Sequence, residues 1–309
     1  MLAVLAEPGA VRTLRELARA EVTRSCPERR PPAAGHGCAA SRLLRLERVG
    51  AVSRSLDPSG EDPRFGLTDR GWELLGVAER AARWEERAGW SARDREPGHA
   101  ALATLSRPYT FAIMCQLADG SLDAAELLER VGAARRGERH VAARRVQEMQ
   151  GRGLLASADP PSSTPLSLTD SARGLAAIVL LALWCERGSL AHRPASTVDL
   201  LGPMRVLVPL VGLPADLAGT FLLYQSLARR PECSLCLRAS GGSLTPLASI
   251  PTSGLGGFAI AAPGAWLRTL VTGQTSGIAA AGDLDALAVV ISALGSPARL
   301  GHGVPDRVA

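Results

Sequence analysis

The chain has 309 residues, 46% of them hydrophobic and only 4% aromatic, which predicts two or three domains with mainly aliphatic cores. No apolar run is long enough to cross a bilayer, and residues 1–4 lack the basic segment that opens a signal peptide. We therefore expect a cytoplasmic protein with no membrane partner and six reduced cysteines. The formal net charge is only +5 and all 35 basic residues are arginine, so polyanion binding has to come from local arginine clusters.

The first 95 residues are predicted to form one small helical unit. A short helix at the very start looks truncated, and a second helix covers about residues 10–22. A Pro- and Gly-rich insertion at 26–37 separates it from a third helix at 38–49. A hairpin follows at 52–67, and a closing helix at 69–88. Residues 96–98 (Glu-Pro-Gly) are expected to be a linker.

Residues 96–193 repeat this order more regularly. Helices are predicted at 107–118, 123–131 and 138–151. Two short strands, 153–156 and 166–168, flank a Pro-rich turn at 160–165, and a closing helix covers 170–186. Three helices, a two-stranded wing and a further helix are typical of a winged helix-turn-helix unit.

The two units share sequence as well as order. Leu-Thr-Asp at 67–69 leads to Trp-Glu-Glu-Arg at 84–87, and Leu-Thr-Asp at 168–170 leads to Trp-Cys-Glu-Arg at 184–187. Before each copy, an Arg-rich helical stretch ends at a glycine, in residues 42–50 and 144–153. Such an internal repeat indicates a tandem architecture.

Beyond residue 193 charge becomes sparse, with seven arginines and six acidic residues in the last 116 positions. A helix is predicted at 199–211, strands at 217–227, 232–238, 244–250 and 257–262, and helices at 265–272 and 284–294. Strands first and helices last indicate an α+β domain over residues 194–309.

The repeated unit resembles the HxlR-type winged-helix transcriptional regulators, which are relatives of the MarR group. Residues 101–190 carry the family's first-helix-and-turn pattern at 113–120 and its recognition-helix exit at 147–154. Residues 1–90 match from about residue 5 and depart at the truncated start and the insertion. Residues 217–297 are similar to sterol carrier protein type 2 domains, on residues 265–273 and 282–287, and such fusions occur in some actinobacteria. The resemblance implies a mainly α protein with small β wings, followed by an α+β domain of a ligand-binding kind.

The arginine clusters in the two third helices are the candidate DNA contacts, for phosphate neutralisation and base reading in a major groove. The alternative is a solvated helix face. The candidates are Arg135, Arg136, Arg139, His140, Arg144, Arg145 and Arg152 in the second unit, and Arg42, Arg45 and Arg48 in the first.

Aromatic residues are the candidate ligand contacts. The relatives of the C-terminal domain hold apolar molecules between a sheet and helices, which implies a pocket wall of Phe221, Tyr224, Phe258 and Trp266. The alternative is that these four form the core. Trp84 and Trp184 lie on the closing helices, which we expect to pack between the two winged-helix units, and they are the next candidates.

No metal, cofactor or catalytic site is expected. Cys233 and Cys236 form a lone Cys-x-x-Cys, and Cys26, His36 and Cys38 lie in a Pro-rich loop, so ordinary thiols are the simpler interpretation. No catalytic constellation has supporting context, so we expect no enzyme activity.

The sequence thus predicts a transcriptional regulator that binds double-stranded DNA as an intramolecular pseudo-dimer and senses a hydrophobic small molecule. Homo-oligomerisation stays open. One alternative is a drug-sequestering resistance protein on the same fold, and another is an enzyme that reuses the scaffold.

Overall fold

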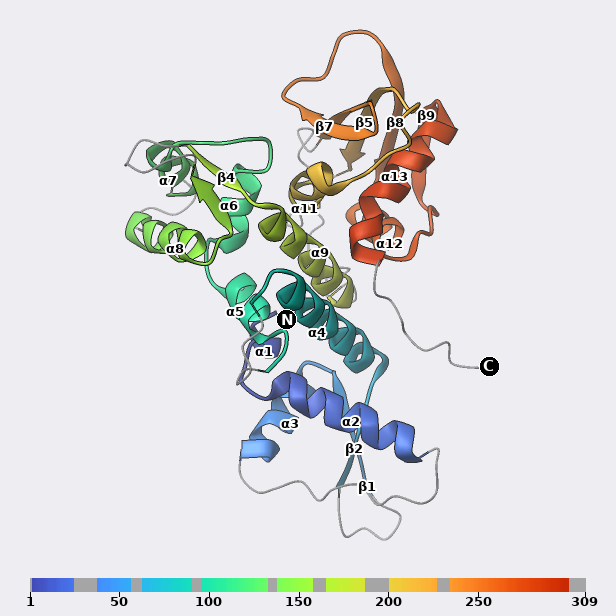
Figure 1. The fold of residues 1–309 in the computed structure, drawn as a ribbon. Helices are drawn as coiled ribbons and strands as arrows, with labels where there is room; N and C mark the ends of the chain where they lie inside the picture. The colour runs from blue at the N-terminus through green and yellow to red at the C-terminus, as the bar shows by residue number, and fades with distance from the viewer. Residues whose placement is uncertain are drawn as a thin grey trace. The chain divides into compact units, whose positions relative to one another are not determined.

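Among the residues that the structure describes, helices combine with three small sheets, two of two strands and one of five. The computed structural model describes residues 2–24, 38–56, 63–90, 96–132, 138–157, 165–186, 200–226 and 234–299. It divides into two compact units, the first ending at Ser106 and the second beginning at Arg107 (Figure 1). Within the described ranges, no helix is both long and apolar enough to span a membrane. The division into three domains stays a prediction.

The described part of the first unit holds α1 (Leu2–Leu5), α2 (Ala10–Arg24), α3 (Cys38–Arg48), β1 (Val52–Leu56), β2 (Pro63–Leu67), α4 (Asp69–Arg87) and α5 (His99–Ser106). Strands β1 and β2 form an antiparallel hairpin, with Val52 opposite Leu67. Helix α5 was not expected, since the sequence placed only a linker before residue 107. It packs against α1 and α4, so this segment belongs to the first unit.

A buried carboxylate holds α5 in place. Glu85 of α4 is only 4% exposed, and its two carboxylate oxygens accept hydrogen bonds from Gly98 N and Ala101 N, both at 2.7 Å. The first N–H groups of a helix have no partner within the helix and carry a partial positive charge, so a carboxylate there is stabilising. Glu96 supports the same region by accepting a hydrogen bond from Gly9 N at 2.9 Å.

The second unit begins with α6 (Thr110–Gln116), α7 (Ala124–Gly132), α8 (Arg139–Gly151), β3 (Leu155–Ser157), β4 (Leu166–Leu168) and α9 (Asp170–Cys185). Strands β3 and β4 are antiparallel, and Leu122 adds a backbone bridge to Leu166. Gly9 and Tyr109 each follow a proline and have positive φ (78° and 67°) immediately before α2 and α6. By this correspondence α2 is the counterpart of α6, the first helix of the second repeat, whereas the sequence predicts α2 as the second helix of its own repeat.

The two repeats share hydrogen bonds around their hairpins. In the first repeat these bonds run from Ala51 N to Leu46 O (2.8 Å), from Thr68 N to Ala51 O (3.1 Å) and from Thr68 Oγ1 to Gly50 O (2.6 Å). In the second repeat the equivalent bonds, in the same order, run from Leu154 N to Met149 O (2.9 Å), from Thr169 N to Leu154 O (3.1 Å) and from Thr169 Oγ1 to Gly153 O (3.0 Å). Each threonine also caps the helix that follows. Gly50 and Gly153 both have positive φ. Residues of α3 and α8 can therefore be matched one to one.

The rest of the second unit holds α11 (Leu201–Leu207), a 3₁₀ turn (Val208–Leu210), β5 (Gly219–Gln225), β6 (Ser234–Ser240), β7 (Ser243–Leu247), β8 (Leu255–Ala261), α12 (Pro263–Thr272), β9 (Ile278–Gly282) and α13 (Leu284–Arg299). The strand order is β7-β6-β5-β8-β9, with β5 parallel to β8 and every other neighbouring pair antiparallel. Strand β9 was not expected.

Helix α9 joins the second repeat to this sheet. Most of its residues are buried, and it packs against α11, α12 and α13. Arg173 on α9 is buried and donates hydrogen bonds to Ala118 O at 3.1 Å and to Val206 O at 3.3 Å. The closing helix of the repeat is thus also a core helix of the C-terminal part.

Candidate nucleic-acid interface

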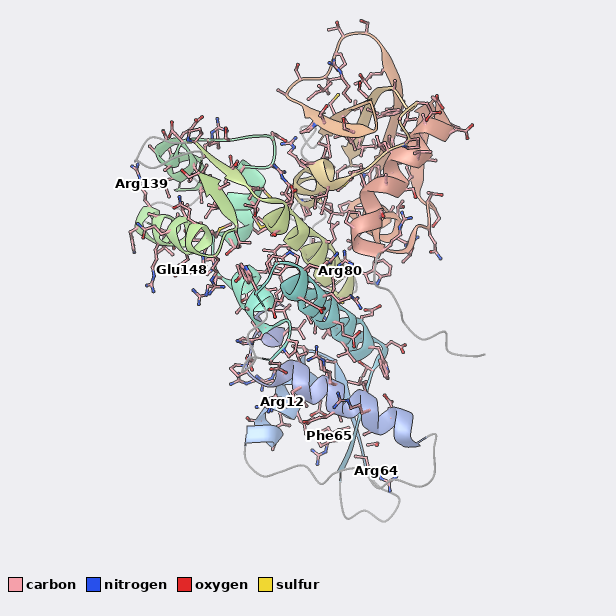
Figure 2. The ribbon with its side chains drawn as sticks, viewed as in Figure 1. Arg12, Arg64, Phe65, Arg80, Arg139 and Glu148 are labelled. Atoms are coloured by element: carbon pink, nitrogen blue, oxygen red, sulfur yellow. The ribbon has the colours of Figure 1, made fainter. Side chains whose placement is uncertain are left out.

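Helix α8 has one apolar face and one polar face. Ala142, Val146 and Met149 are buried, and α8 packs against α7 and β3. The exposed polar side chains are Arg139, His140, Arg144, Gln147 and Gln150. Figure 2 labels Arg139 and Glu148 on this helix. The exposed face combines cationic groups that suit phosphates with amides that suit base edges. The two glutamines had not been singled out from the sequence, although each is polar at an outward position of the helix.

Arg145 differs from its neighbour Arg144. The Arg144 side chain is 82% exposed, whereas Arg145 is only 6% exposed. Arg145 Nη1 lies 2.7 Å from Glu148 Oε2, although its Nε and Nη1 atoms have no aligned hydrogen-bond acceptor among the described residues. Burial lowers the pKa of the Arg145 guanidinium, and Glu148 opposes that shift. The predicted DNA contact at Arg145 is therefore wrong, because the side chain is buried within its own unit.

Glu148 lies among three arginines. Its Oε2 atom also accepts a hydrogen bond from Arg107 Nη1 at 2.7 Å, and its Oε1 atom lies 3.3 Å from Arg144 Nε. Burial alone raises the pKa of the Glu148 carboxyl, but the charges of Arg145 and Arg107 outweigh it and hold the pKa below its usual value. Glu148 therefore neutralises part of the positive charge that the sequence assigned to this helix.

The remaining candidates of the second unit are of two kinds. Arg135 and Arg136 lie outside the described residues. Arg152 caps the C-terminus of α8, is half-buried and has a partner of its own. Arg139, His140 and Arg144 are therefore the candidates that remain exposed.

Helix α3 presents a different surface. It packs on α2 and β1 through the buried Leu43 and Leu46. Arg42 is half-buried and donates from Nη1 to Thr13 Oγ1 at 3.3 Å. The exposed side chains between Ser41 and Arg48 are Ser41, Leu44, Arg45 and Arg48.

Each repeat has an ion pair at equivalent positions, but the acidic and basic residues are exchanged between the two repeats. Arg45 Nη1 lies 2.6 Å from Glu7 Oε1. Glu148 is the counterpart of Arg45, since each lies five residues before the positive-φ glycine, and it pairs with Arg107. Glu7 and Arg107 each precede the proline at the start of the unit.

The four aromatic candidates of the C-terminal part do not share one wall. Phe221 is 1% exposed and pairs with Gly257, on the face of the sheet that meets α13. Trp266 is fully buried and donates from Nε1 to Tyr224 O at 3.0 Å. Phe258 is 43% exposed and pairs with Leu222, so it lies on the other face together with Tyr224. Alternation along the strand separates these side chains, and the single pocket wall is corrected accordingly.

The remaining candidates are the tryptophans of the closing helices and the Cys and His residues considered as metal ligands. Trp84 is buried and packs edge-on against Trp90, with ring centroids 4.8 Å apart, and Trp184 is half-buried. Their proposed role between the winged-helix units stays a prediction. Cys236 is buried, which raises the pKa of its thiol, while Cys26, His36 and Cys233 lie outside the described residues. Over the described ranges, no group of three or more His, Cys, Asp or Glu side chains could hold a metal ion.

Comparison with known proteins adds no relative: no family model, curated protein or solved structure matches the chain.

Proposed function

We propose that the protein is a transcriptional regulator that binds double-stranded DNA through α8 and α3 of a tandem pair of winged helix-turn-helix units. The observation that carries the proposal is the exposed face of α8, on which Arg139, His140 and Arg144 lie beside Gln147. Arginine neutralises phosphates, and glutamine can pair with the edge of adenine. The buried face anchors the helix on α7 and β3, so the polar face is held on a rigid support.

One chain supplies both reading helices in this proposal. Helix α5 precedes the second repeat, yet it packs on α1 and α4 of the first unit and is capped by Glu85. The first unit therefore extends to Ser106 and the second begins at Arg107, and this direct covalent connection of two repeats supports an intramolecular pseudo-dimer.

A hydrophobic small molecule is the proposed effector. Helix α9 provides the coupling in this proposal, because it belongs to the core of both the second repeat and the C-terminal part, with Arg173 bonded to carbonyls of both. A ligand with unequal affinity for the DNA-bound and free forms changes DNA affinity reciprocally, typically by about 1–3 kcal/mol. A change around α9 is a direct route for such coupling.

The decisive experiment measures the binding of the full chain to genomic DNA fragments over a range of salt concentrations. Arg144→Ala should weaken binding and reduce the slope of log K against log salt by about 0.9, as expected for one lost phosphate contact. Arg238→Ala removes an exposed arginine from β6 and serves as the control. If wild-type protein binds no fragment even at low salt, the regulator is excluded and ligand sequestration becomes the leading function.

A further inference from the structure

Helices α3 and α8 carry different chemistry at the same point of their outward faces. Leu44 and Gln147 each lie six residues before the positive-φ glycine that ends the helix segment, Gly50 and Gly153 respectively. The shared hydrogen bonds around the two hairpins make this match exact to the residue, because Leu46 and Met149 accept the same backbone bond. Leu44 and Gln147 are therefore equivalent positions in the two repeats.

Leu44 is an apolar side chain in a cationic setting. It is 53% exposed and lies on one stripe of α3 with Ser41, Arg45 and Arg48, at helical spacings of three and four. A single exposed leucine needs no explanation by itself. Here, however, two exposed arginines lie beside it, Arg48 and the Glu7-paired Arg45, and the positive charge favours a polyanion over an apolar protein surface as the partner of this face.

We propose that α3 and α8 read different bases, and that Leu44 of α3 contacts the C5 methyl group of a thymine while Gln147 of α8 pairs with an adenine. This inference rests on the proposed DNA-binding function. In the major groove the thymine methyl is the apolar group that a leucine can cover, while adenine offers the N7 acceptor and N6 donor that a glutamine amide can bind together. The DNA site of this protein is then asymmetric, although the protein itself is a repeat.

The test starts with duplexes selected from a random DNA library by the full chain. Each thymine of the selected sequence is replaced in turn by deoxyuridine, which lacks only the C5 methyl group. Replacement of one thymine, in one half of the site, should lower the affinity of the protein about fourfold, which corresponds to the ~0.8 kcal/mol of one buried methyl-sized group. Leu44→Ala should abolish this dependence on the methyl group. Gln147→Ala should instead relax the adenine preference in the other half.

Leu284→Ala is the matched control, because Leu284 is an equally exposed leucine, 55% exposed, on α13. It should leave both the affinity and the uracil effect unchanged. A selected site with identical halves, or equal affinity for thymine and uracil at every position, overturns this inference while DNA binding stands. Failure to select any duplex overturns the DNA-binding proposal and this inference with it.

Discussion

Glu85 provides a quantitative test of how α5 is held in the first unit. Its carboxylate is 4% exposed and accepts two backbone hydrogen bonds at 2.7 Å, from Gly98 and Ala101. Hydrogen bonds to charged groups contribute about 1.5–3 kcal/mol each, so Glu85→Ala should lower the free energy of opening of α5 by about 3 kcal/mol or more. Glu85→Gln keeps one acceptor oxygen and should lose about half as much.

Hydrogen–deuterium exchange of peptides covering residues 98–106 measures this loss directly. A change of 3 kcal/mol corresponds to roughly 100-fold faster exchange. Glu86→Ala, one residue further along α4 and exposed, is the control and should change exchange by less than threefold, within the ~0.5 kcal/mol typical of surface substitutions. Equal exchange in the Glu85→Ala and Glu86→Ala proteins would show that the carboxylate does not hold α5.

Two substitutions and one truncation test other parts of the fold. A Cβ at Gly71 would lie 2.1 Å from Ala51 O, so Gly71→Ala should cost about 3 kcal/mol in urea unfolding, whereas Gly76→Ala on the same helix meets no atom within 4 Å and should stabilise by ~1 kcal/mol. Because the folded-state pKa of Glu148 is lowered, the stabilisation that its carboxylate provides is present above its unfolded pKa near 4.5 and is lost as pH falls through the folded value. The urea midpoint of the wild-type protein should therefore fall in acid by this contribution, whereas that of Glu148→Gln should not. Truncation after Glu186 removes the helices that cover α9 and exposes its apolar surface, so light scattering should show aggregation. A fragment that stays soluble and monomeric would contradict this.

Local signals predicted most elements and failed where packing decides. The closing helices predicted to start at 69 and 170 begin at those residues in the structure, where Thr68 and Thr169 cap α4 and α9. Strand β9 has no sequence signal, because residues 278–282 are one isoleucine, three alanines and a glycine, with no alternation. Helix α5 is short and owes its place to Glu85, thirteen residues before Gly98, a contact that no local pattern reveals.

The candidate site was predictable in part for the same reason. Arginine density pointed to α8, and Arg139 and Arg144 are indeed exposed. Density alone could not separate Arg144 from Arg145, whereas helical periodicity could have, since Arg145 shares the inward face with Ala142 and Met149. The aromatic residues show the same point on a strand, where Phe221 and Tyr224 are three apart and so face opposite sides.

The inverted ion pairs have a consequence for how a chain with two similar repeats reaches its native state. Neighbouring repeats are prone to exchange equivalent segments during folding, and the segment that leads each repeat here has an equivalent position in the other repeat. In an exchanged arrangement Glu7 would lie against Glu148, and Arg107 against Arg45. Like charges would then repel at both positions, whereas the native arrangement satisfies both. Opposite charges at equivalent positions thus favour pairing within each repeat over pairing between the repeats.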